Sequence, residues 1–267
     1  MPSFDDRGFP LFYEVQGRGG IPLVWIVGMG DSGRGWLSLQ VSDLAAQRCN
    51  VLFDPRGTGR SGDPKHSFTT RDLAEDVRAL MDHLSLERAH VLGSFLGGMV
   101  AQELALTDPG RVQSLILVGS YARPDAKRRL LLDLWRREAQ HGLTLDIWSR
   151  LRLCWTLSDA TLEQDELIEA MLRGSGDAGG FDEERLVRQI DACLAHDTTA
   201  RLPLIQAPTL VVHGEDDILT PPHLARELAS GIPDAELVLM VGAGHLCMAE
   251  LAPRFNRLVE RFIRAHD

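Results

Sequence analysis

Hydrophobic residues recur along the chain with two different periods that alternate with each other. Short apolar runs bounded by glycine, proline or charged residues predict strands at residues 10–16, 22–27, 51–54, 90–92, 112–119, 208–217 and 237–241. Apolar positions at 73, 77, 80, 81 and 84 have helical spacing, and Thr69 and Asp72 are placed to cap that helix. Such alternation with short connections favours a mostly parallel sheet with helices on both faces.

The pattern changes between residues 121 and 202. Strand-like runs are absent there, charged and aliphatic residues recur at helical spacing, and residues 174–180 form a glycine-rich break. Three of the five tryptophans, Trp135, Trp148 and Trp155, fall in this segment. They either form the core of a helical subdomain or face a ligand.

A strand turns sharply into a helix at Gly93-Ser94-Phe95-Leu96-Gly97. Glycines two residues before and two after a central position are the spacing of the nucleophile elbow, G-x-S-x-G, because side chains there would clash with the tight turn. The stretch resembles the elbow of the α/β-hydrolase family, but Phe95 stands where that family has serine. Shifting the register to Ser94 places Leu96 where the turn requires glycine, so we expect the Ser94 side chain to point away from the site.

A second glycine-rich loop, Gly28 to Gly33, matches G-x-G-x-x-G and follows a predicted strand. With Asp54 about 20 residues later, it fits a dinucleotide-binding fingerprint. The alternative is the oxyanion loop of a hydrolase, in which the backbone N–H of Met29 points into the site beside that of Leu96. The following segment, 54–62, resembles the hydrolase pattern D-x-R-G-x-G-x-S, so we favour the second interpretation.

The resemblance implies an α/β-hydrolase fold with an eight-stranded, mostly parallel sheet. It divides the chain into a core of residues 1–120 and 203–267 and an inserted helical cap at 121–202. It also implies that Asp217 and His245 are the acid and the base, in the family's order of nucleophile, acid, base. Asp216 is the neighbouring candidate, but the spacing from Gly214 favours Asp217. His213 is interpreted as a half-buried strand residue.

Composition narrows the function classes. The chain has 267 residues, 44% hydrophobic and 25% charged, with a net charge of −10, which argues against nucleic acid as a partner. Apolar runs are shorter than the ~20 residues that span a bilayer, and no signal-peptide pattern precedes them, so we expect a cytoplasmic protein. Four scattered cysteines suit a reducing compartment and argue against a zinc site.

A phenyl ring at the elbow offers neither a nucleophile nor a proton. Three functions remain open. His245 and Asp217 act as a general base on a small hydrophobic substrate with a carbonyl group, driving elimination, cyclisation, decarboxylation or cofactor-free oxygenation. Alternatively, His245 activates water for hydrolysis of an ester, lactone or C–C bond, or the site only binds a ligand. We favour the first, without a metal or cofactor.

Two points stay open. An engineered Phe95 is disfavoured because alanine is the commoner replacement for a catalytic serine. The sequence does not distinguish a monomer from a homodimer.

Overall fold

The computed structural model describes residues 3–5, 7–174 and 182–267. Within these ranges one sheet of eight strands has the order β1-β2-β4-β3-β5-β6-β7-β8. The strands are β1 (Ser3–Asp5), β2 (Pro10–Gln16), β3 (Leu23–Ile26), β4 (Asn50–Phe53), β5 (Ala89–Ser94), β6 (Val112–Val118), β7 (Thr209–Gly214) and β8 (Ala235–Met240).

The sheet is mostly parallel, as predicted. The pairs β1·β2 and β2·β4 are antiparallel, and all pairs from β4 to β8 are parallel. Every residue of β3, β4, β5 and β7 is buried, because helices cover both faces of a parallel sheet. These are the strands that the sequence shows as nearly continuous apolar runs.

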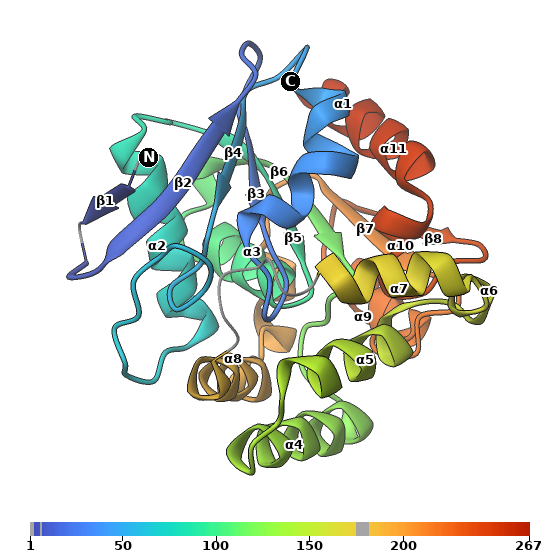
Figure 1. The fold of residues 1–267 in the computed structure, drawn as a ribbon. Coiled ribbons are helices and arrows are strands. Elements are labelled where there is room, and N and C mark those ends of the chain that lie inside the picture. Colours follow the sequence, from blue (N-terminus) through green and yellow to red (C-terminus); the bar gives the residue numbers. More distant parts are fainter. Residues whose placement is uncertain (1–2, 6, 175–181) are drawn as a thin grey trace.

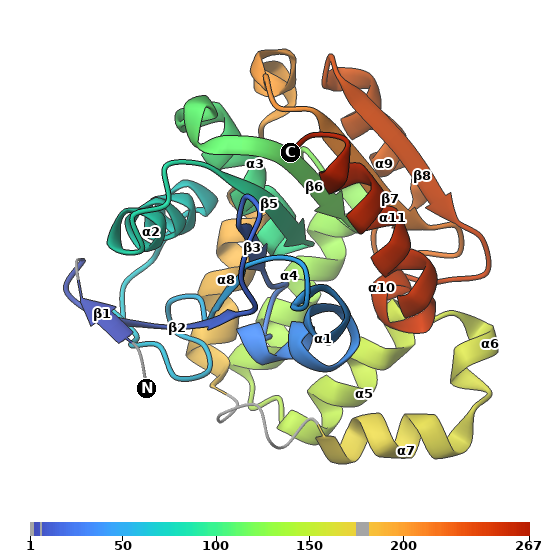
Figure 2. The same ribbon diagram turned by 90° about the horizontal axis from the view of Figure 1, so that it is seen from above.

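Helices pack on both faces of the sheet (Figures 1 and 2). One face is covered by α2 (Thr70–His83), α3 (Leu96–Thr107) and α9 (Pro222–Gly231), whose buried residues include Val77, Met99 and Leu228. The other carries α1 (Ser42–Leu44), α10 (Cys247–Glu250) and α11 (Ala252–Arg264), with Trp36 and Phe255 in its core. The sheet thus separates two apolar layers, the arrangement expected from the alternating pattern.

Local signals explain several element ends. Thr69 and Asp72 form the capping box of α2, with each side chain bonded to the other's backbone N–H. The segment after the Gly28–Gly33 loop is not one regular helix but consists of η1 (Gly33–Trp36), η2 (Leu37–Val41) and α1. The short strand β1 was not predicted, since three half-exposed residues carry little periodic signal.

A helical insertion lies between β6 and β7, at one end of the sheet (Figure 1). It contains α4 (Ala126–Gln140), α5 (Leu145–Thr156), α6 (Asp159–Leu162), α7 (Asp165–Gly174) and α8 (Glu183–Ala195), followed by the turn η5 (Thr199–Leu204). Apart from Gly174, the glycine-rich break falls outside the described residues. The division into core and cap at 121 and 202 remains a prediction. None of the described helices has the length and apolarity that crossing a membrane requires.

Candidate active site

The candidate residues follow the carboxyl ends of neighbouring parallel strands. Met29 comes after β3, Phe95 after β5 and Gly119 after β6, while Asp217 and His245 follow β7 and β8. Because these strand ends share one edge of the sheet, residues far apart in the sequence meet there. The helical insertion lies over this edge (Figure 1).

The turn between β5 and α3 requires its flanking glycines. A Cβ on Gly93 would collide with the carbonyl oxygen of Gly97, and one on Gly97 with the backbone at Ile26 and Val27. The backbone of Phe95 at the apex has φ 48° and ψ −108°, in a region that L-residues rarely occupy. The chain therefore makes a sharp, strained turn at Phe95 that depends on both flanking glycines.

Backbone hydrogen bonds hold the apex in this conformation. The N–H of Phe95 donates to the carbonyl of Val118 at 2.9 Å, and its own carbonyl accepts from Ser120 Oγ at 2.9 Å. The Phe95 ring is 3% exposed and makes edge contacts with Tyr121 and His245, at centroid distances of 5.9 and 5.5 Å. The ring thus occupies the space beside the imidazole.

His245 and Asp217 form a buried pair. Nδ1 of His245 lies 2.8 Å from Oδ2 of Asp217, and the two side chains are 4% and 0% exposed. Thr220 completes the network: its N–H donates to Oδ1 of Asp217 at 2.7 Å, and its hydroxyl lies 2.7 Å from Oδ2 and 3.0 Å from the imidazole Nδ1. With Nδ1 facing the carboxylate, Nε2 is the nitrogen left for the cavity.

The electrostatics favour an ionised Asp217. Burial alone would raise its pKa, but the neighbouring positive charge of His245 and the hydrogen bonds from His245 and Thr220 outweigh burial and hold the pKa below its usual value. Asp216, the alternative acid, is exposed to solvent. The carboxylate that contacts the imidazole is therefore Asp217.

The structure corrects the interpretation of His213, which is fully buried rather than half-buried. Its Nε2 accepts from the N–H of Ser120 at 3.2 Å, and its Nδ1 lies 3.1 Å from the carbonyl oxygen of Thr220. Burial is the main cause that lowers the pKa of His213 to about 4. A neutral His213 therefore links the strand end that precedes Ser120 to the loop that carries Asp217 and Thr220.

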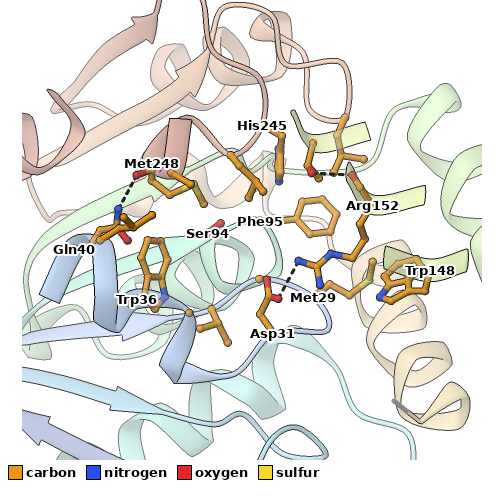
Figure 3. Close-up of a pocket in the computed structure, with 18 of the residues that line it drawn as sticks. Met29, Asp31, Trp36, Gln40, Ser94, Phe95, Trp148, Arg152, His245 and Met248 are labelled. Atoms are coloured by element: carbon orange, nitrogen blue, oxygen red, sulfur yellow. Dashed lines mark hydrogen bonds and ion pairs between the residues drawn. The ribbon is translucent and has the colours of Figure 1, made fainter. Parts of the chain in front are cut away.

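A cavity of about 220 Å³ opens beside the Phe95 ring (Figure 3). Its walls are mainly apolar and aromatic and include Trp36, Leu39, Trp135, Trp148, Leu219, Leu246 and Met248. Trp135 and Trp148 come from the helical insertion and pack edge to face, with centroids 5.4 Å apart. Trp155 instead packs behind Trp135 at 6.4 Å and does not line the cavity.

The prediction that Ser94 points away from the site is wrong, because Ser94 lines the cavity. Side chains alternate along a strand, so Ser94 projects from the same face of β5 as Leu92. Leu92 packs in the core layer that contains Trp36 and Met248, and both of these also line the cavity. The cavity thus extends past the apex onto this face.

The two predicted oxyanion donors differ in position. Met29 lines the cavity, whereas Leu96 is 3% exposed and is not part of the cavity wall. Among the described residues, the N–H groups of Met29 and Leu96 donate to no protein acceptor. Both N–H groups are therefore available to a ligand oxygen, but only Met29 belongs to the described cavity wall.

Asp54 has a structural role that accounts for the first glycine-rich loop. Its carboxylate accepts from the N–H of Gly33 and from the backbone and side chain of Arg60, and it is 1% exposed. A Cβ on Gly33 would lie 2.7 Å from the carbonyl oxygen of Phe53. Close packing therefore explains Gly33, a φ of 77° explains Gly30, and the acid of the apparent dinucleotide fingerprint is already engaged.

Cysteine and metal chemistry find little support at this site. Cys247, two residues after His245, is fully buried, and burial raises the pKa of its thiol. Across residues 3–5, 7–174 and 182–267, no three His, Cys, Asp or Glu side chains are grouped closely enough to hold a metal ion.

Sequence reasoning missed several site residues. Thr220 could have been found, because an aspartate three residues before a threonine is a local capping pattern. Trp36, Asp31 and Arg152 carry no such signal, because they reach the cavity only through the packing of η1 and α5 against the core. Arg152 comes from the insertion and forms an ion pair with Asp31, with NH2 3.0 Å from Oδ1.

Comparison with known proteins places the chain among proteins of one fold. Residues 21–250 match the family model described as alpha/beta hydrolase fold. A protein of Azorhizobium caulinodans that bears the name of a carbamate hydrolase, RutD, is 31% identical over 270 residues, covering 98% of each chain. The Mycobacterium tuberculosis protein named as a non-heme bromoperoxidase, BpoC, is 32% identical over 261 residues, or 94% of this chain and 97% of that protein.

Solved structures agree with this placement. The BpoC crystal structure has a TM-score of 0.89 at 30% identity and covers 96% of both chains. The enol-lactonase from Burkholderia xenovorans has a TM-score of 0.90 at 26% identity, covering 98% of this chain and 100% of that one. The similarity extends over the core and the helical insertion alike.

Proposed function

We propose that in this chain, a member of the α/β-hydrolase fold family, Phe95 stands at the position of the nucleophilic serine. We further propose that His245 acts as a general base. The substrate is a small hydrophobic molecule with a carbonyl group. For elimination, cyclisation or oxygenation by dioxygen, the reaction starts when His245 removes a proton next to that carbonyl. In a decarboxylation, loss of CO₂ forms the enolate, which then takes a proton from the His245 imidazolium. No acyl-enzyme forms, because a phenyl ring cannot attack a carbonyl carbon.

The observation that carries this proposal is the buried His245–Asp217 pair facing a phenyl ring. The 2.8 Å contact fixes the imidazole with Nδ1 toward the carboxylate, which leaves Nε2 as the proton acceptor. The imidazolium that forms is stabilised by the Asp217 charge. A site that only binds apolar ligands would have no use for a buried carboxylate hydrogen-bonded to an imidazole, because burying a charge costs desolvation energy.

The backbone N–H groups of Met29 and Leu96, which have no protein acceptor, complete the proposed mechanism. An N–H without a protein acceptor can donate to the oxygen of an enolate, where negative charge develops. Met29 lies in the cavity wall and is the primary donor in this scheme. Leu96 contributes once a substrate oxygen reaches the deeper position beside the apex.

The cavity walls support the substrate class. Trp36, Trp135 and Trp148 offer flat apolar surfaces suited to a ring or an acyl chain. Carbamate and enol-lactone, which appear in the names of two relatives, both contain a carbonyl group. We therefore also propose that the helical insertion acts as the cap that excludes water from this cavity.

Deuterium exchange tests the proposed proton transfer without knowledge of the natural substrate. Small cyclic ketones and lactones are incubated with the protein in D₂O and analysed by mass spectrometry. We expect deuterium next to the carbonyl with wild type and only background exchange with His245→Ala. His223→Ala removes an exposed histidine that does not line the cavity and should exchange like wild type. Equal exchange by the wild-type and His245→Ala proteins would contradict the proposed role of His245 as the base.

The missing nucleophile has its own test. A fluorophosphonate should not label the wild-type protein, and labelling at Ser94, which lines the cavity, would show that the wrong residue was placed at the apex. Phe95→Ser should become labelled and gain esterase activity, with Phe95→Ala as the matched control that removes the ring without adding a hydroxyl. Failure of Phe95→Ser to label would contradict the proposed position of Phe95.

A further inference from the structure

Arg152 occupies an unusual place between two cavities. It projects from α5 toward the Phe95 ring, and its only described ion pair joins it to Asp31 of the loop after β3 (Figure 3). Both residues line the cavity beside Phe95, and both also line a second cavity of about 480 Å³ beneath α8. The pair therefore forms part of the wall between the two spaces.

The guanidinium of Arg152 has few interactions with the rest of the protein. Its one ion pair places NH2 3.0 Å from Oδ1 of Asp31, and the side chain is 30% exposed, although a guanidinium carries five N–H donors. Among the described residues, no other side-chain or backbone group accepts from it. By contrast, Arg56 is 3% exposed and engages both carboxylate oxygens of Asp76 at 2.6 Å. Arg56 thus holds its carboxylate through two nitrogens, whereas Arg152 contacts Asp31 through one.

The charge distribution of the first cavity isolates Arg152 further. Among its described lining residues, Arg152 is the one permanent cation and Asp31 the one carboxylate. The remaining wall is apolar apart from His245 and a few neutral polar groups. A cavity of about 220 Å³ is also smaller than the roughly 300–1,000 Å³ that typical ligand sites occupy. Among the described lining residues, Arg152 is therefore the permanent countercharge that a negatively charged group on a ligand would meet.

We propose that Arg152 is an anion-recognition residue and that the ligand of this site is a carboxylate with an apolar ring or chain. The apolar part lies in the first cavity beside Phe95 and His245. The carboxylate takes the free edge of the guanidinium, where two parallel N–H groups match its two oxygens. This deepens the proposed function by naming a substrate class, and it depends on that function only in placing the ligand beside His245.

A purely structural role for the Asp31–Arg152 pair predicts a different effect of mutations on ligand binding than anion recognition does. If the pair only ties α5 to the core, removal of either partner has the same effect on the cavity. If Arg152 recognises an anion, Arg152→Met removes the recognition group, whereas Asp31→Asn removes a competing negative charge. The two variants therefore distinguish the two roles by the direction of their effects.

Binding of phenylacetate and 3-phenylpropanoate, each compared with its neutral amide, tests this proposal through quenching of tryptophan fluorescence. We expect wild type to bind the acids more tightly than the amides. Arg152→Met should weaken acid binding by about tenfold or more, since hydrogen bonds to charged groups are the strong ones, and should leave amide binding unchanged. Asp31→Asn should strengthen acid binding by about threefold or more.

Two controls keep the result interpretable. Arg150→Met removes a charge from the same helix, where Arg150 pairs with Asp146 in solvent, and should bind like wild type. His245→Ala should still bind the acids, so loss of proton transfer and loss of anion recognition are read separately. Equal weakening by Arg152→Met and Asp31→Asn, equal affinity for acids and amides, or no binding of either acid to wild type would each overturn the proposal.

Discussion

At the scale of single residues, Gly119 shows how closely the imidazole is held. Gly119 follows β6 with φ +53°, and a Cβ there would lie 2.7 Å from Cε1 and 3.0 Å from Nδ1 of His245. The ring therefore packs directly on a backbone that has no side chain. Both the conformation and the close approach require glycine.

We expect Gly119→Ala to lower the free energy of unfolding by roughly 1–3 kcal/mol, because a positive φ and a displaced ring are both costly. Urea unfolding measures this change, and the ring resonances of His245 in ¹⁵N NMR report the displacement. Gly110→Ala is the matched control, since a Cβ there has no neighbour within 4 Å. Similar unfolding energies for the two variants would contradict the proposed packing.

The residue scale also shows why the site was only partly predictable. Asp217 and His245 follow strand ends in turns rich in glycine or acidic residues, and the resemblance to the α/β-hydrolase family singled them out as the acid and the base. The predicted orientation of Ser94 was wrong because it followed from the turn alone and not from the alternation of side chains along β5. Arg152 was missed because its role depends on where a helix of the insertion packs.

At the scale of elements, a glutamate joins the loop that carries His245 to the helical insertion. Oε2 of Glu250, on α10, accepts from the N–H of Gly244 at 2.6 Å. Its Oε1 accepts from the N–H and hydroxyl of Ser158 at 2.8 and 2.7 Å. A further bond runs from the N–H of Leu246 to the carbonyl of Thr156 at the end of α5. Three elements thus meet around the residues that flank His245.

Replacing Glu250 by glutamine should destabilise this junction. The amide has one acceptor oxygen for donors on two sides, so its NH₂ group must face an N–H of either Gly244 or Ser158. One buried donor then loses its partner, and we expect the free energy of unfolding to fall by about 1–3 kcal/mol. Faster hydrogen exchange at the Gly244 amide should accompany the loss, as read by NMR.

Glu260→Gln is the control for this prediction, because Glu260 makes an i,i+4 ion pair with Arg264 on α11, away from the junction. Such pairs contribute only about 0.3–0.5 kcal/mol, so this variant should remain close to wild type. If Glu250→Gln and Glu260→Gln unfold alike, the carboxylate does not hold the loop.

Element types were largely predictable because the two periods of the apolar residues differ so clearly. Strands β3, β5 and β7 are buried on both sides, so each contains consecutive apolar residues, as in Leu210-Val211-Val212 of β7. The segment 33–44 was harder, because Gly33 and Gly35 interrupt helical spacing and the chain takes tighter and wider turns in succession. Its conformation depends on packing against β4, where Gly33 meets the backbone of Phe53.

At the scale of the whole molecule, three buried histidines besides His245 are distributed over different parts of the fold. His90 lies on β5, His196 follows α8 and His213 lies on β7. Burial is the largest cause that lowers the pKa of each to about 4. Unfolding would return each to an aqueous environment, where histidine has a pKa of about 6.5.

Stability should therefore fall as the pH is lowered from about 6.5 to about 4, because in this window the unfolded chain binds protons that the folded chain does not. Each histidine contributes up to about 3 kcal/mol across the window. Urea unfolding at intervals of pH measures the slope, and His213→Gln should make it shallower by removing one titrating group. His66→Gln, at an exposed loop position, should retain the wild-type slope. An unchanged slope in His213→Gln would show that His213 is not held neutral in the folded protein.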